Sequence, residues 1–165
     1  MQPDRIEPAR AQDAALLAAM AREYVEDGLR PGWSAARIGW HMRDADSLVL
    51  TARSDRSIAG FAIMRYADDS AHLNLLAVAP PHRRRGVGRR LIRWLEETAI
   101  TAGTFRIGLE LRARNETARA FYRTLGYSEL DQIPGYYQGV ESAIRMARDL
   151  RAQHAAAPGA PQRAP

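Results

Sequence analysis

The chain has 165 residues, and neither cysteine nor lysine occurs among them. Without cysteine, the protein can form no disulfide, no thiolate metal site and no acetyl-enzyme thioester. Without lysine, it has neither the amine of a Walker A phosphate loop nor a Schiff-base amine. All apolar runs are far shorter than the roughly 18 residues that span a bilayer, and residues 1–10 lack the apolar stretch of a signal peptide. We therefore expect a cytoplasmic protein, with no metal and no membrane partner.

Every basic residue, 24 in all, is an arginine, and the net charge is +5. This balance is compatible with nucleic acid, with a membrane surface or with a small anionic ligand. The arginines are not interleaved with aromatic residues in the way that single-strand binders use for base stacking. A small anionic ligand is therefore a better expectation than nucleic acid. The densest cluster consists of Arg83, Arg84, Arg85, Arg89 and Arg90.

The length and the composition, 46% hydrophobic and 26% charged, are typical of one globular domain. We place this domain at residues 1–150. Residues 151–165 are rich in alanine and proline and lack an apolar period, so we expect a disordered tail there.

The periodicity predicts helices over residues 13–26, over a short stretch after Ser34 that contains Ile38 and Met42, and over residues 86–101 and 116–125. Strands are predicted over residues 5–9, 47–53, 58–66, 71–79, 105–111, 127–130 and 143–147. This order of elements favours an α/β fold around one mostly antiparallel sheet.

The most informative segment joins a predicted strand to a predicted helix and reads Arg83-Arg84-Arg85-Gly86-Val87-Gly88. Two glycines one residue apart permit a tight turn and a close approach of the backbone. The free amides of a first helical turn and the helix dipole favour an anion at that point. Leu91 stands where a dinucleotide fingerprint has its third glycine. The segment predicts a pyrophosphate site, with a solvated basic turn as the alternative.

A strand followed by this segment resembles the acetyl-CoA motif of the GNAT acetyltransferase superfamily, through Arg83-x-x-Gly86-x-Gly88. A second block resembles the other half of that cofactor region: Leu109-Glu110-Leu111-Arg112-Ala113-Arg114-Asn115, Ala118 and Phe121-Tyr122-x-x-Leu125-Gly126-Tyr127. The resemblance implies acetyl-CoA as co-substrate and a mixed, mostly antiparallel sheet flanked by helices on both faces. A narrower resemblance, to bacterial enzymes that acetylate the N-terminal alanine of a small-subunit ribosomal protein, is carried by Glu110, Asn115, Tyr122, Gly135-Tyr136-Tyr137 and Glu141-Ser142-Ala143.

The resemblance implies a catalytic role for two ionisable residues. Glu110 would accept a proton from the attacking amine, directly or through water, and Tyr122 would donate to the leaving thiolate. From spacing alone, Glu110 is an exposed strand carboxylate and Tyr122 is a core residue of an amphipathic helix, and these alternatives stay open. Because no thiol is present, direct attack in a ternary complex is expected.

Other residues are expected, by the same resemblance, to bind acetyl-CoA. They are Leu76, Ala77, Val78, Arg84, Arg85, Gly86, Val87, Gly88, Arg89 and Asn115. The strand backbone would bond the pantetheine arm as an added strand does, and the Val78 amide would donate to the oxyanion. Asn115 is also a candidate N-cap of the following helix.

The acceptor is less well defined. A protein N-terminal α-amine is the first expectation and a small amine, such as an antibiotic, a polyamine or an amino acid, is the second. A non-enzymatic acetyl-CoA sensor or nucleic-acid-binding module is the third. His72 is a candidate for contacting the acceptor, with a simple polar strand position as the alternative. Tyr136 and Tyr137, in a predicted loop, are candidates as well, with packing as the alternative. Trp33 and Trp40 are expected in the core, with ligand binding as the alternative. A monomer or a homodimer is expected.

Overall fold

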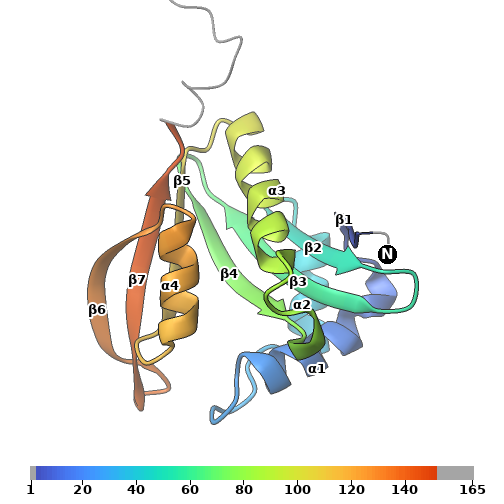
Figure 1. Ribbon diagram of the computed structural model, residues 1–165, viewed down its shortest axis with the longest axis horizontal. Coiled ribbons are helices and arrows are strands. Elements are labelled where there is room, and N and C mark those ends of the chain that lie inside the picture. Colours follow the sequence, from blue (N-terminus) through green and yellow to red (C-terminus); the bar gives the residue numbers. More distant parts are fainter. Residues whose placement is uncertain (1–2, 152–165) are drawn as a thin grey trace, which may run out of the picture.

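The computed structural model describes residues 3–151 and contains one seven-stranded sheet (Figure 1). Its strands are β1 (Arg5–Pro8), β2 (Ser47–Arg53), β3 (Ile58–Tyr66), β4 (Ala71–Val78), β5 (Arg106–Arg112), β6 (Ser128–Tyr137) and β7 (Glu141–Asp149). They lie in the order β1-β2-β3-β4-β5-β7-β6, and all neighbours are antiparallel except β4 and β5. The predicted mostly antiparallel sheet is confirmed.

Helices cover both faces of this sheet: α1 (Ala14–Tyr24), α2 (Ala35–Arg43), α3 (Val87–Thr101) and α4 (Glu116–Thr124), with 3₁₀ turns η1 (Ala11–Asp13) and η2 (Pro80–His82). Successive strand residues point to opposite faces. On β3, Phe61 and Ile63 belong to the core that contains α1 and α2 side chains, whereas Ala62 and Met64 belong to the core beneath α3 and α4. In Figure 1, α3 and α4 lie in front of the sheet and α1 and α2 behind it. The predicted α/β layering is thus confirmed.

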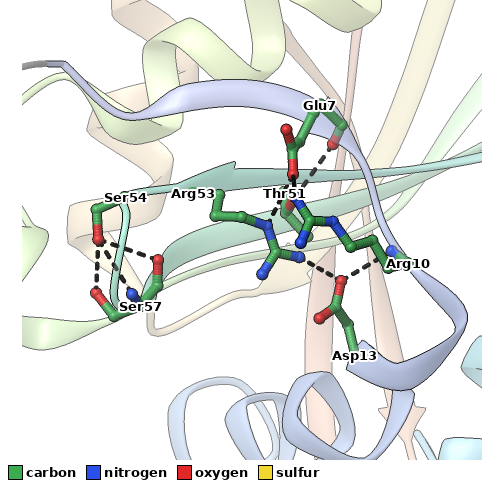
Figure 2. Close-up of polar contacts among 7 residues, drawn as sticks. All are labelled: Glu7, Arg10, Asp13, Thr51, Arg53, Ser54 and Ser57. Atoms are coloured by element: carbon green, nitrogen blue, oxygen red, sulfur yellow. Dashed lines mark hydrogen bonds and ion pairs between the residues drawn. The ribbon is translucent and has the colours of Figure 1, made fainter.

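A charged network ties β1 and the start of α1 to β2 (Figure 2). Arg53 bonds the carboxylates of both Glu7 and Asp13, with 2.8 Å from its Nε to Glu7 Oε1. Asp13 is buried and also accepts from the Arg10 amide at 2.8 Å. A buried carboxylate needs such partners because removing it from water is costly. Arg53 therefore has a structural role at the β1 edge of the sheet.

The C-terminal hairpin is longer than its apolar pattern predicts. The strand expected over residues 127–130 continues to Tyr137, so Tyr136 and Tyr137 lie on β6 rather than in a loop. β6 is an outer strand with irregular register between Ile133 and Tyr137, and prolines such as Pro134 are accepted at edges and bulges. Most β6 side chains are exposed, which hides the alternation by which strands are recognised.

The predicted core position of Trp40 is wrong, because this residue lies at the surface and is 48% exposed. The short helix α2 buries Ile38, Gly39 and His41, so the residue between them faces outward. Its ring contacts His41 edge-on, with 4.8 Å between centroids, and the Arg65 guanidinium lies 5.5 Å away. Trp33, in contrast, is half-buried against the core of α1 and α2.

The sheet divides between β4 and β5. These parallel strands pair only at Ala71↔Ile107 and His72↔Gly108, and beyond this point the two halves diverge toward the bottom of Figure 1. β4 stays paired with β3 as far as Gly60↔Val78. The second half of β4 therefore keeps one edge free for hydrogen bonding, a feature that in other sheets accepts an added strand.

None of the described helices is both long and apolar enough to cross a membrane. Apart from Arg151, the tail predicted over residues 151–165 lies outside the described residues. The domain boundary at residue 150 stays a prediction.

Candidate active site

A cavity of about 530 Å³ occupies the space between the diverging strands. Residues 73–76 of β4 and residues 109–112 of β5 form its walls, together with side chains of α4. Residues 24–33 and the end of β6 complete the rim. Among the residues singled out from the sequence, this lining includes Leu76, Glu110, Asn115, Tyr122, Trp33, Tyr136 and Tyr137. It does not include His72, Ala77, Val78 or the loop at residues 84–89.

Glu110 projects from β5 opposite to the buried Leu109 and Leu111, as the alternation predicts. Its Oε2 is hydrogen-bonded to Nε2 of His72 on β4, and its Oε1 lies 3.9 Å from the Arg145 guanidinium. The hydrogen bond from His72 holds the pKa of Glu110 below its ordinary value despite partial burial. Glu110 is therefore an ionised carboxylate at neutral pH, directly on the cavity wall.

Tyr122 lies on α4 and is buried, with its ring packed against Phe121 and Tyr127 at centroid distances of 5.1 and 5.6 Å. Burial, and to a smaller extent Tyr137, raises the pKa of Tyr122 well above its ordinary value. The phenol therefore keeps its proton at neutral pH and can donate a hydrogen bond. The residue packs in the core, as the helical spacing indicates, and it also borders the cavity, while its catalytic role stays a prediction.

The glycine loop begins α3 without a side-chain cap. Gly86 is the N-cap, with a left-handed φ of 79°, and the first helical bond runs from Arg90 N to Gly86 O at 3.0 Å. The amides that precede Arg90 in the first turn have no intrahelical acceptor. Arg84, Arg85 and Arg89 are exposed around them. This is the arrangement that favours a phosphate group.

The second glycine of the loop has a packing role as well. A Cβ added to Gly88 would lie 3.2 Å from Phe121 Cζ and 3.7 Å from Val78 Cγ2. At Gly86 the added Cβ would meet nothing within 4 Å. Gly86 is thus required by its backbone conformation, whereas Gly88 allows α3 to approach α4 and β4 closely.

The model of the acetyltransferase (GNAT) family matches residues 14–127, which contain both walls of the cavity and the glycine loop. The chain belongs to the GNAT acetyltransferase family. The resemblance noted from the sequence is confirmed, and with it the enzyme class: an N-acetyltransferase that uses acetyl-CoA as co-substrate.

Two relatives of this GNAT protein carry the name [Ribosomal protein bS18]-alanine N-acetyltransferase. The protein of Salmonella typhimurium is 42% identical over 104 residues, which cover 61% of this chain and 69% of that protein. That of Escherichia coli is 39% identical over 93 residues, which cover 54% of this chain and 63% of that protein. These matches thus span about two thirds of the relatives' own lengths. The crystal structure of the ribosomal-protein-S18-alanine N-acetyltransferase from Escherichia coli is similar with a TM-score of 0.77 and 28% identity, over 88% of this chain and 93% of that one.

The acetyl-CoA residues expected in this GNAT chain have suitable geometry for that ligand. The uncapped start of α3 and its three exposed arginines suit a pyrophosphate. The free edge of β4 at Leu76, Ala77 and Val78 suits the amides of a pantetheine arm. Asn115 is confirmed as the N-cap of α4, because its Oδ1 accepts from the Ala118 amide at 3.1 Å. Its Nδ2 remains a possible donor to a ligand, since Asn115 also borders the cavity.

The rim of the cavity contains a bridge that the sequence does not reveal. The side-chain amide of Gln138 accepts from Arg30 N at 3.0 Å and donates to Arg30 O at 2.8 Å. Arg112 Nη2 also donates to Asp27 O at 2.6 Å. Glu26, which is buried, accepts from the amides of Gly32 and Trp33 and shapes the same loop. The only sequence signal for the bridge is the pair of glycines, Gly135 and Gly139, that flank Gln138.

Proposed function

We propose that this GNAT enzyme transfers the acetyl group of acetyl-CoA to the N-terminal α-amine of a protein that begins with alanine. The observation that carries the proposal is the presence of an ionised carboxylate, Glu110, and a protonated phenol, Tyr122, on the wall of one cavity. The names of the two relatives support the choice of acceptor. The acceptor is a peptide chain made in the cytoplasm, which is also the proposed location of the reaction.

In this proposal, acetyl-CoA supplies an activated acetyl thioester, and the residues of this chain bind and orient it. The amides at the start of α3 hold the pyrophosphate, with Arg84, Arg85 and Arg89 around it. The backbone of Leu76, Ala77 and Val78 bonds the pantetheine arm, and the Val78 amide donates to the oxyanion. Asn115 donates from its Nδ2. The absence of cysteine from the chain favours direct attack by the amine.

Glu110 then acts as the proton acceptor. An α-amine has a pKa of about 7.7–8.0, so a large part of it is protonated at neutral pH and cannot attack. The ionised Glu110 attracts this ammonium group and takes its proton, directly or through water.

Tyr122 acts on the leaving sulfur. Its pKa lies above that of an ordinary thiol, which is about 8.5, so donating a hydrogen bond is more favourable than losing its proton. This hydrogen bond stabilises the negative charge that develops on sulfur.

The acceptor is tested with the purified full chain, acetyl-CoA and a panel of amines. The panel contains a peptide that begins with alanine, a polyamine and an aminoglycoside. It also contains a second peptide that differs from the first in having a formylated N-terminus and an internal lysine. We expect mass spectrometry to show one added acetyl group on the free α-amine of the first peptide and none on the formylated peptide. Acetylation of only the polyamine or the aminoglycoside would refute the proposal and identify a small-molecule enzyme instead.

A further inference from the structure

Acetylation of an ammonium group releases a proton that the site must export, an argument that rests on the function proposed above. The group R–NH₃⁺ and the acetyl thioester give R–NH–acetyl, the free thiol and one proton. Nitrogen loses two protons, one of which is balanced by the thiol, while the other leaves to solvent. The Glu110 side chain is only 15% exposed, so a more exposed neighbour that contacts it is well placed to carry this proton onward.

His72 lies between Glu110 and solvent. His72 pairs with Gly108 in the last register pair before β4 and β5 diverge, and its Nε2 bonds Oε2 of Glu110, which lies further along β5. Glu110 and Asn74 border the cavity, whereas His72 does not, and the His72 side chain is 46% exposed. These contacts connect the cavity with the surface of the protein.

Asn74 determines which nitrogen of His72 exchanges its proton. The Oδ1 of Asn74 lies 2.7 Å from His72 Nδ1, and an amide oxygen can only accept a hydrogen bond. Nδ1 therefore keeps its proton in both states of the ring. Nε2 donates to Glu110 while His72 is an imidazolium, and it can accept a proton once the ring is neutral. We propose that His72, held in this tautomer by Asn74, receives through Glu110 the proton that leaves the acceptor amine and releases it to solvent. His72 is thus a positioning residue that acts through Glu110.

The protons balance over one turnover. With His72 neutral, the amine proton passes to Glu110 and on to His72 Nε2, which leaves Glu110 ionised and His72 as an imidazolium. The imidazolium loses this proton to water at its exposed side, and the neutral ring is restored. Of the two protons that nitrogen loses, only the one not retained by the thiol contributes to the net flow along this path.

The charged and titratable groups around the pair set the pH at which this path operates. Besides Glu110, they are Arg65 on β3, Asp131, Tyr136 and Tyr137 on β6, and Arg145 on β7. Arg65 is bonded to Asp44 at 3.1 Å, and Arg145 lies 3.7 Å from Asp131. Burial raises the pKa of both tyrosines, so they stay neutral while His72 titrates.

Three neighbours shift the pKa of His72, two of them upward and one downward. The hydrogen bond to Glu110 raises the pKa of His72 most, the bond to Asn74 adds to this, and the charge of Arg145 lowers it. Because only neutral His72 accepts a proton, kcat falls as the pH drops below the pKa of His72. Asn74→Leu should therefore move this acid limb to lower pH, and Arg145→Gln should move it to higher pH.

The test measures kcat of the full chain between about pH 5 and pH 9, with the amine that the wild type acetylates fastest. We expect His72→Ala and His72→Gln to lose about 10²-fold in kcat, the lower end of acid–base effects. Added imidazole should partly restore His72→Ala, because the exposed position admits it, and should not restore Glu110→Gln. His82→Ala is the matched control. This histidine lies on η2, whereas the Glu110 carboxylate contacts His72 and Arg145, so the variant should keep the wild-type kcat with or without imidazole.

Wild-type kcat and an unshifted acid limb in His72→Ala would overturn the proposal, as would a loss that imidazole does not restore. A second measurement needs no acceptor: the His72 ring is titrated by NMR in the wild type and in Glu110→Gln, where its pKa should fall. If the ring does not respond to Glu110, the role of His72 is wrong whatever the acceptor. If the ring responds but no amine is acetylated, the proposed function fails and the proton path fails with it.

Discussion

At the scale of single residues, a substitution at Tyr122 tests hydrogen-bond donation separately from packing. Tyr122→Phe keeps the ring contacts with Phe121 and Tyr127 and removes only the hydroxyl. We expect kcat to fall by about 10²–10⁴-fold, the usual range for acid–base assistance, while acetyl-CoA affinity stays nearly unchanged. Steady-state kinetics and calorimetry measure the two quantities.

The matched control is Tyr127→Phe, a buried tyrosine on the same core whose hydroxyl bonds Glu96 at 3.2 Å rather than bordering the cavity. Loss of this bond should cost about 1 kcal/mol of stability and leave kcat unchanged. Full kcat in Tyr122→Phe would show that its hydroxyl does not assist the leaving group.

Glu110→Gln tests the proton acceptor. The change keeps the shape of the side chain and removes its charge, so an ammonium group is no longer deprotonated in the site. We expect kcat to be low at neutral pH and to recover partly above about pH 8, where the α-amine loses its proton unaided. Tyr122→Phe should show no such recovery, because its defect lies at the sulfur. A wild-type profile for Glu110→Gln, measured over the same pH range, would rule out the role of Glu110.

Single residues also show how far the sequence alone reaches. Glu110 and Tyr122 were found because each stands in a motif block, and the structure places both on one cavity. The contact between His72 and Glu110 was not predicted, because it joins residues 38 positions apart through the register of two parallel strands. Periodicity gives the face of a strand on which a side chain lies, but not the strand that lies beside it.

At the scale of elements, the start of α3 carries the prediction for acetyl-CoA binding. Gly86→Glu places a negative charge beside the uncapped amides, whereas Gly86→Asn adds a neutral side chain that tolerates the left-handed conformation. An added Cβ meets nothing within 4 Å, so neither change is expected to disrupt packing. We expect calorimetry to show at least about tenfold weaker acetyl-CoA binding for Gly86→Glu, equivalent to about 1.4 kcal/mol, and a much smaller loss for Gly86→Asn. Equal affinities in the two variants would contradict a phosphate site at this helix start.

Elements with a buried face were predicted to within a few residues, whereas the extent of the exposed strand β6 was not. α3 repeats Val87, Leu91, Leu95 and Ala99 on its buried side, which produces a clear helical period. β6 has no comparable pattern because it is an edge strand with mostly exposed side chains. The tyrosines at its end were therefore assigned to a loop, although their position on a strand is what brings them to the cavity.

At the scale of the whole molecule, the site depends on a sheet that is divided between β4 and β5. Two bridging pairs hold the halves together at one end, and the cavity occupies the other end. Glu110 comes from one half, His72 and the free strand edge from the other, and Tyr122 from the helix that follows β5. The motif blocks identify these parts, but their convergence follows from the strand order, which no local pattern specifies.

We expect the folded domain to end close to Leu150. Leu150 is fully buried, and its amide donates to Phe105 O at 2.7 Å, so the core extends to this residue. Residues 152–165 are rich in alanine and proline and contain no apolar period. We expect a chain that ends at Arg151 to lose less than about 1 kcal/mol of stability, within the range of surface changes, and to keep its acetyl-CoA affinity. A chain that ends at Asp149 is the control, and it should lose about 2–5 kcal/mol because a buried leucine side chain is removed. Thermal and denaturant unfolding measure both chains, and a large loss in the chain that ends at Arg151 would mean that the folded domain extends beyond residue 150.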